Sequence, residues 1–311
     1  MACLPLCVHA SSGNHPGSNN VKIHAMLNGG HANDAIAALQ NILTANPQKA
    51  EAHNFLCRVY EQERLWPEAI RECELAVQQQ PDSSEFHLWL GRNEGEEAEH
   101  ASLFAAFNLA RKVHAEFETA VRLDPRNVAA LSDLGEYETE APGFLGGGVD
   151  KAEAIAQQLQ PLDAVKSHEL LARIAQKRKD PATTERELKL AVAQAKNPAK
   201  AWMNLAVFYA RQGNFLIMEQ DIQSGLATDT HHDSALVDGA SILIRYKRNF
   251  PLAETMLRMY LASPNQSEDA PVFQAETMLG NLLAHEGNSA AAQQEYAAAK
   301  ALASGYVVKQ H

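Results

Sequence analysis

The sequence predicts an all-α fold in which helical hairpins are stacked in series, and three observations support this prediction. Signature residues return after 34 positions, as Pro47 and Pro81 do. Hydrophobic residues make up 46% of the chain and aromatic residues only 6%, with many alanines, and this balance favours closely packed helices over strands. Gly-Asn pairs at 213–214 and 287–288 separate segments of helical length. Because a unit of this size buries its apolar face only against its neighbours, stacking is obligatory.

The clearest early unit spans residues 50–83. Its signature residues stand at positions 7, 11, 20, 27 and 32 of the unit and are Leu56, Tyr60, Ala69, Ala76 and Pro81. Small residues let the two helices of a hairpin touch, larger residues fill the space toward the next hairpin, and proline ends the second helix. In the half-unit before it, Ala35 lies one period ahead of Ala69.

The third unit contains an insertion near 94–112. Its closing proline therefore comes ten residues late, and its signature residues are Leu90, Gly91, Phe117, Ala120 and Pro125. We expect the insertion to lengthen both helices of the unit or to add a turn. Three apolar side chains within it either pack on the neighbouring unit or form an exposed contact patch: Leu103, Phe104 and Phe107.

The fourth unit opens with Leu131, Leu134 and Gly135 and contains a second insertion near 141–150. Glycines 146–148 predict a bent loop before the second helix of the unit. The segment lacks the G-x-x-x-x-G-K-[ST] spacing of a phosphate-binding loop and follows a predicted helix rather than a strand. We therefore predict no nucleotide site there.

Later units carry the same signature more weakly. A degenerate unit precedes Pro198, a clear one begins at residue 199, a weaker one spans about 233–266, and the last contains residues 279–299. The unit from residue 199 carries Trp202, Leu205, Ala206 and Tyr209. Together these segments predict about seven or eight units over residues 21–311. Residues 1–20 show no helical periodicity, and we expect them to be disordered or a degenerate export signal.

These positions, recurring in register, resemble the tetratricopeptide repeat (TPR) family, and the insertions resemble those of bacterial TPR proteins of unassigned function. The resemblance covers nearly everything after residue 20. It implies a right-handed superhelical solenoid with a concave face lined by the first helix of each unit. It also implies a non-enzymatic scaffold that binds a protein or peptide partner in that groove.

The candidate partner-binding residues are those expected on the concave face. Trp and Arg are the types that most often anchor partners, and Asn and Arg can hold the backbone or a carboxylate of an extended peptide. The alternative interpretation is that they only solvate a helix face. The candidates are Asn54, Arg58, Trp89, Arg92, Asp133, Glu136, Asn204 and Arg211.

Charge and motifs exclude several functions. The formal net charge of −11, from 38 acidic and 27 basic residues, disfavours nucleic acid or an anionic membrane as the main partner. No apolar run is long enough to span a bilayer. Without motif support for a nucleophile, a metal site or a cofactor, we predict no enzyme activity, no metal and no cofactor. Two rival hypotheses remain: an enzyme or enzyme subunit with chemistry in the insertions, and self-association through the terminal repeats.

Two cysteines form a candidate disulfide. Cys57 and Cys73 fall at positions 8 and 24 of one repeat, on its two helices, and both should point into the hairpin. A bridge would require Cα atoms within about 7 Å and would indicate an oxidising, periplasmic location. The alternative is a pair of buried thiols, which is compatible with the cytoplasm.

Overall fold

The computed structural model describes residues 16–307. Over that range the chain forms sixteen α-helices and one 3-10 helix, with no strand. The elements are α1 Pro16–Asn28, α2 Ala32–Ala45, α3 Ala50–Gln62, α4 Trp66–Gln79, α5 Ser84–His100, α6 Leu103–Leu123, α7 Val128–Glu140, η1 Gly143–Leu145, α8 Val149–Leu159, α9 Ala164–Lys177, α10 Pro181–Gln194, α11 Ala199–Arg211, α12 Phe215–Thr228, α13 Ala235–Arg245, α14 Phe250–Leu261, α15 Val272–His285 and α16 Ser289–Leu302.

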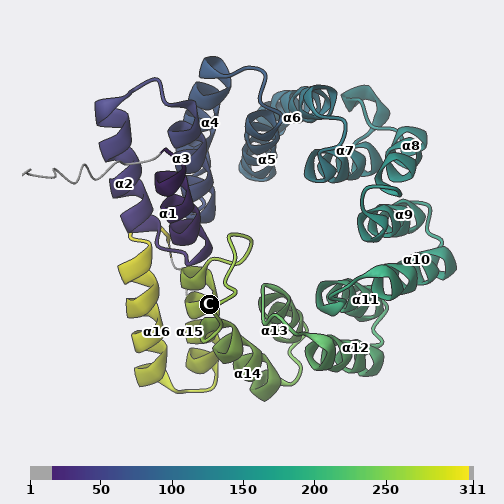
Figure 1. Ribbon diagram of the computed structural model, residues 1–311. Helices are drawn as coiled ribbons and strands as arrows, with labels where there is room; N and C mark the ends of the chain where they lie inside the picture. The colour runs from purple at the N-terminus through teal and green to yellow at the C-terminus, as the bar shows by residue number, and fades with distance from the viewer. Residues whose placement is uncertain (1–15, 308–311) are drawn as a thin grey trace, which may run out of the picture.

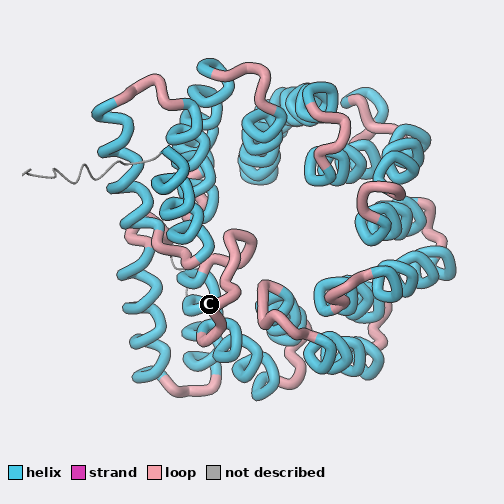
Figure 2. The backbone as a smooth tube through the Cα atoms, viewed as in Figure 1, coloured by secondary structure: helices cyan, strands magenta, loops and turns pink. Residues whose placement is uncertain are grey.

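Consecutive helices pair into eight hairpins, and the hairpins stack in chain order. From α5 to α14 the first helix of each hairpin faces the interior and the second lies outside (Figure 1). Short loops join most helices, and the connection before α15 lies toward the inside (Figure 2). The predicted all-α TPR-type solenoid is confirmed. None of the helices in residues 16–307 is long and apolar enough to cross a bilayer.

The signature residues do the packing that their sizes predict. Ala69 and Ala76 on α4 are fully buried between helices. On α5, a Cβ on Gly91 would come 2.6 Å from the Phe117 ring of α6, so only glycine allows this approach. A side-chain cap fixes the start of some helices, for example α5, where the Ser83 hydroxyl accepts from the Phe86 amide at 3.3 Å.

The two ends of the stack meet and close it into a ring (Figure 1). One apolar cluster contains side chains from both ends, including Leu27 of α1, Leu39 of α2, Phe273 of α15 and Ala299 of α16. The open groove implied by the resemblance is therefore a closed interior. The sequence did not reveal this, because the residues that join the ends are more than 200 positions apart.

Polar contacts reinforce the closure. Arg58 of α3 donates from Nε and Nη2 to the two carboxylate oxygens of Glu268, at 2.7 and 2.5 Å. Glu268 belongs to the connection between α14 and α15. The Gly305 amide donates to Glu63 at 2.8 Å, and the Asn33 amide donates to the Ala301 carbonyl at 2.9 Å. The terminal hairpins are therefore each other's neighbours within one chain.

The insertions have different structures. The first extends both helices of its hairpin, so α5 has 17 residues and α6 has 21. The second forms η1 and a glycine loop in which Gly146 has a φ of 100°. Helix α1 begins at Pro16, within the segment expected to lack structure, and residues 1–15 lie outside the described range.

Candidate functional site

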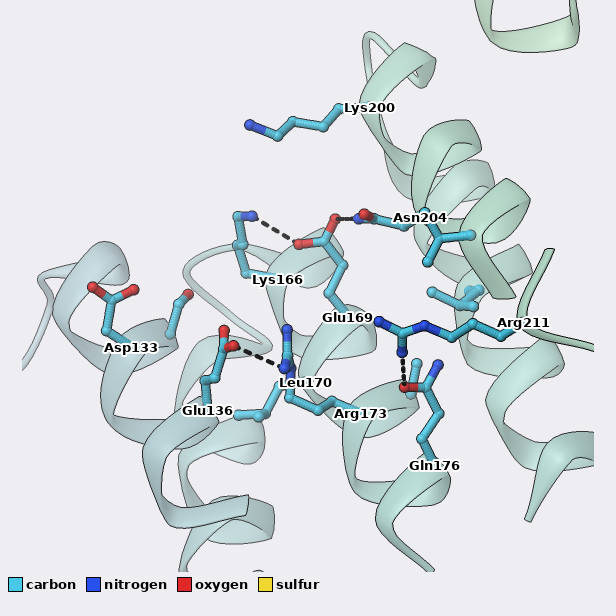
Figure 3. A pocket seen from close by; sticks show the side chains of 14 residues that line it. Asp133, Glu136, Lys166, Glu169, Leu170, Arg173, Gln176, Lys200, Asn204 and Arg211 are labelled. Atoms are coloured by element: carbon cyan, nitrogen blue, oxygen red, sulfur yellow. Dashed lines mark hydrogen bonds and ion pairs between the residues drawn. The ribbon is translucent and has the colours of Figure 1, made fainter. Parts of the chain in front are cut away.

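The interior wall formed by α7, α9 and α11 contains a pocket of about 330 Å³. First helices of three successive hairpins contribute most of its polar side chains (Figure 3). Its charged and amide-bearing residues are Asp133, Glu136, Lys166, Glu169, Arg173, Gln176, Lys200, Asn204 and Arg211.

Each carboxylate of this pocket has a cationic partner. Lys166 Nζ lies 2.7 Å from a Glu169 oxygen, and Asn204 donates to the other oxygen at 2.8 Å. Arg173 Nη1 lies 2.8 Å from Glu136 (Figure 3). Burial lowers the pKa of Lys166, but attraction to Glu169 outweighs it, so that the pKa is raised and the side chain stays charged.

Asp133 is paired with a residue outside the pocket. Arg92 of α5 donates from Nε to Asp133 at 2.6 Å, and its guanidinium carbon lies 4.8 Å from the centroid of the Trp89 ring. The guanidinium of Arg58 lies 5.0 Å from the same ring. Trp89 therefore joins the closure contact to the pocket by cation–π contacts.

Two cations of the pocket have no carboxylate within hydrogen-bonding distance among the described residues. Lys200 Nζ lies 3.7 Å from Asp269, and both side chains are more than half exposed. Arg211 donates only to the neutral Gln176 amide oxygen, at 3.4 Å, which is beyond the usual hydrogen-bond range. In a chain with a net charge of −11, these two side chains make the pocket locally cationic.

The structure brings together half of the predicted partner-binding residues. Four of them line the pocket: Asp133, Glu136, Asn204 and Arg211. Trp89 and Arg92 lie beside it through the contacts described above. Asn54 and Arg58 are only 2% and 6% exposed, so neither side chain is free to hold a partner in this conformation. Arg58 instead holds Glu268, because closure of the ring covers α3.

Lys166, Glu169, Arg173 and Gln176 of the pocket were not among the predicted residues. They lie on α9, the first helix of the degenerate unit. The missing Trp and Tyr signature in that unit hid its register, and aligning backward from the unit at residue 199 would have found it.

Another part of the interior, which borders the first pocket at the Lys200–Asp269 ion pair, is acidic. A second pocket, of about 380 Å³, is lined by five carboxylates together with Arg64 and His100: Glu61, Glu96, Glu99, Glu268 and Asp269. Burial, followed by the charge of Glu268, raises the pKa of Glu61 to about 7. The interior is therefore divided into a cationic and an acidic part.

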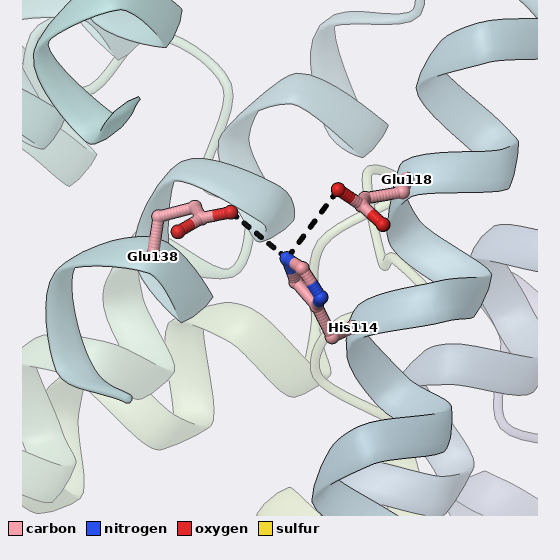
Figure 4. Close-up of side chains that lie close together, drawn as sticks. All are labelled: His114, Glu118 and Glu138. Carbon is pink, nitrogen blue, oxygen red and sulfur yellow. Dashed lines mark hydrogen bonds and ion pairs between the residues drawn. The ribbon is translucent and has the colours of Figure 1, made fainter. Parts of the chain in front are cut away.

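Two histidine–carboxylate clusters among the described residues have the composition of a cation site, one around His114 and one made of Asp229, His231 and Asp233. His114 Nε2 of α6 lies 2.9 Å from Glu138 of α7 and 3.7 Å from Glu118 (Figure 4). The Lys151 ammonium lies 3.3 Å from the same Glu138 oxygen. A metal ion at this place would have to displace that ammonium, so the contacts fit an ion-pair network better than a metal centre.

Cys57 and Cys73 meet between α3 and α4. Both are fully buried, their Cα atoms are 5.2 Å apart, and the sulfur atoms are placed at bonding distance. This geometry permits the candidate disulfide.

Comparison with known proteins supports the fold. Residues 27–92 match a family model described as tetratricopeptide repeat. A thermophilic TPR protein of Thermus thermophilus is 20% identical, with a TM-score of 0.51 over 61% of this chain and 95% of that one. A TPR protein of Parabacteroides merdae is 14% identical, with a TM-score of 0.50 over 85% and 96% of the chains. A human IFIT1 dimer with m7Gppp-AAAA is 15% identical, with a TM-score of 0.50 over 93% and 72%. No curated protein matches the chain.

Proposed function

We propose that this chain, whose TPR-type hairpins close into a ring, is a non-enzymatic scaffold that holds an extended segment of a partner protein inside that ring. Proteins of this fold commonly mediate protein interactions. The observation that carries the proposal is the pair Lys200 and Arg211, which line the pocket with no carboxylate of the described residues within hydrogen-bonding distance: Lys200 has only the long, exposed ion pair with Asp269.

The chemistry of the interior defines the partner. Carboxylates of an extended segment can bind Lys200 and Arg211, while its backbone binds the amides of Asn204 and Gln176. Basic side chains of the same segment can face the acidic pocket around Glu61. Because the ring is closed, an extended segment can enter along its axis, whereas a folded domain cannot enter from the side.

A charge-reversal experiment tests this proposal. The full chain is used to capture partners from lysate of its native source, with quantitative mass spectrometry of wild type and of Lys200→Glu/Arg211→Glu. The matched control is Lys22→Glu/Arg126→Glu, which makes the same change in net charge at two exposed residues outside the pocket.

We expect the pocket variant to lose partners that the control retains, because its carboxylates repel the acidic segment. Equal recovery by both variants would refute binding in the interior. A single-stranded RNA oligonucleotide is titrated in parallel. RNA binding that depends on Lys200 and Arg211 would show that the partner of the pocket is a nucleic acid and not a protein.

A further inference from the structure

The two insertions, which interrupt the repeat in neighbouring hairpins, meet on the outside of the ring. Phe107 of α6 and Phe144 of η1 stack with ring centroids 6.0 Å apart and an interplanar angle of 15°. The Tyr137 hydroxyl lies 2.8 Å from the Ala110 carbonyl oxygen and 2.9 Å from that of Leu145, so it ties α6 to η1. The segments are thus held together as one surface.

This surface is an apolar ridge made of Leu103, Phe104, Phe107 and Phe144. Leu103 is 91% exposed, Phe104 81%, Phe144 75% and Phe107 39%. Of the eight large hydrophobic side chains that are exposed within residues 16–307, the ridge holds four, and the others are scattered. The sequence left open whether the first insertion packs on its neighbour or is exposed, and the structure shows exposure.

We propose that the apolar ridge is the interface of a two-fold symmetric homodimer. At about 150–250 Å² for a buried aromatic side chain, the exposed fractions of the ridge amount to roughly 500 Å² in each copy. Two copies together would bury about 1,000 Å², which reaches the lower limit of specific interfaces. Clusters of Phe flanked by Arg are typical of interface cores.

Residues beside the ridge make it self-complementary. Arg111 follows Phe107 by one helical turn, is exposed and has no ion pair among the described residues. If α6 packs antiparallel on its copy with the two-fold axis between Phe107 and Asn108, the guanidinium of each copy lies over Phe104 of the other. Two symmetric cation–π contacts result, and no like charges meet at the axis.

A lipid surface fits the ridge less well. Glu97 and Glu99 stand at the end of α5, a few residues before Leu103, and the whole chain carries a net charge of −11. These charges oppose an anionic bilayer. In a dimer the acidic end of α5 lies beside the contact and remains in water.

Sedimentation equilibrium of the full chain tests the dimer. We expect wild type to have twice the chain mass at high concentration and Leu103→Ser/Phe104→Ser to stay monomeric. Both replaced side chains are more than four-fifths exposed, so the variant should fold normally. The matched control is Leu216→Ser, which removes a 70% exposed leucine elsewhere and should still dimerise.

Arg111→Ala tests the register. Loss of two cation–π contacts should raise the dissociation constant of the dimer by about fivefold to thirtyfold. A monomeric wild type, a dimer that the ridge variant does not weaken, or an Arg111→Ala dimer of unchanged affinity would overturn the proposal. The proposal would also be overturned if wild-type monomers sedimented with phosphatidylcholine vesicles and the ridge variant did not, because the ridge would then be a lipid-binding surface. None of these variants touches the interior pocket, so the outcome is independent of the proposed function.

Discussion

Removing one carboxylate tests whether the ring is a closed structure in solution. Glu268→Ala leaves the Arg58 guanidinium, whose side chain is 7% exposed, without its two shortest hydrogen bonds. Breaking a buried ion pair by removing one partner costs about 3–5 kcal/mol, because the remaining charge is uncompensated. Glu85 stays 3.1 Å from Arg58 but is 56% exposed, so we expect the lower end, about 3 kcal/mol.

The assay is urea unfolding followed by circular dichroism, with amide hydrogen exchange to locate the loss. We expect exchange to become faster in α1, α2, α15 and α16, the hairpins that the closure joins. Glu268→Gln keeps the shape and one acceptor and should lose less stability. The matched control is Glu254→Ala, which removes an exposed ion pair with Arg258 and should cost less than about 1 kcal/mol.

Two results would refute the reasoning. If Glu268→Ala unfolds like the control, the Arg58–Glu268 contact is not part of a cooperative closure. If stability falls but exchange rises evenly along the whole stack, the contact is stabilising without joining the two ends.

Three further predictions concern pH, redox state and packing. The pKa of Glu61 is about 7 in the folded chain, above its ordinary 4.5, so the folded state binds the proton more tightly than the unfolded state and the contribution of Glu61 to stability falls as pH rises from about 4.5 through 7. Glu61→Gln should therefore flatten the fall in unfolding free energy measured from pH 5 to 8. Wild-type and variant free energies that fall in parallel with pH would contradict this. A Cys57–Cys73 bridge closes a loop with a sequence separation of 16, so reductant should lower the unfolding free energy of wild type by about 3 kcal/mol. The same reductant should leave the unfolding free energy of Cys57→Ala/Cys73→Ala unchanged. Free thiols in natively sourced protein, detected by non-reducing mass mapping, would exclude the bridge. Gly91→Ala should cost about 1–3 kcal/mol in urea unfolding, because its Cβ would meet the Phe117 ring at 2.6 Å. Gly95→Ala on the same helix finds Val113 only at 3.9 Å and should gain about 0.5–1 kcal/mol, and equal effects would show that the close approach does not control packing.

The repeat could be predicted from the sequence, whereas the closure of the stack into a ring could not, and the reason is physical. Packing within and between adjacent hairpins is local, so the size pattern at Ala69, Ala76 and Gly91 determines it. Closure depends on the curvature that accumulates over eight hairpins, and small rotations at each interface between hairpins determine that curvature. Arg58 was expected to face an open groove, yet the same position in a closed ring meets Glu268. The candidates on α7 and α11 are far from the joint and still line the interior.

A repeated contact shows that the first insertion leaves the stack unchanged. His53 Nδ1 of α3 lies 2.7 Å from Glu72 of α4, and His168 of α9 lies 2.8 Å from Glu187 of α10, each pair 19 residues apart. His87 of α5 makes the same contact with Glu116 of α6, at 2.5 Å, although this pair is 29 residues apart.

The ten extra residues therefore lie beyond the contact and do not shift it. His87 Nε2 also lies 2.9 Å from the Pro81 carbonyl oxygen, as His53 Nε2 lies 3.0 Å from that of Pro47. Because the hairpin packs as its neighbours do, the exposed Leu103 and Phe104 contribute nothing to stacking. Exposed apolar side chains that the fold does not need favour a partner surface, and the ridge is where this chain departs from a plain repeat.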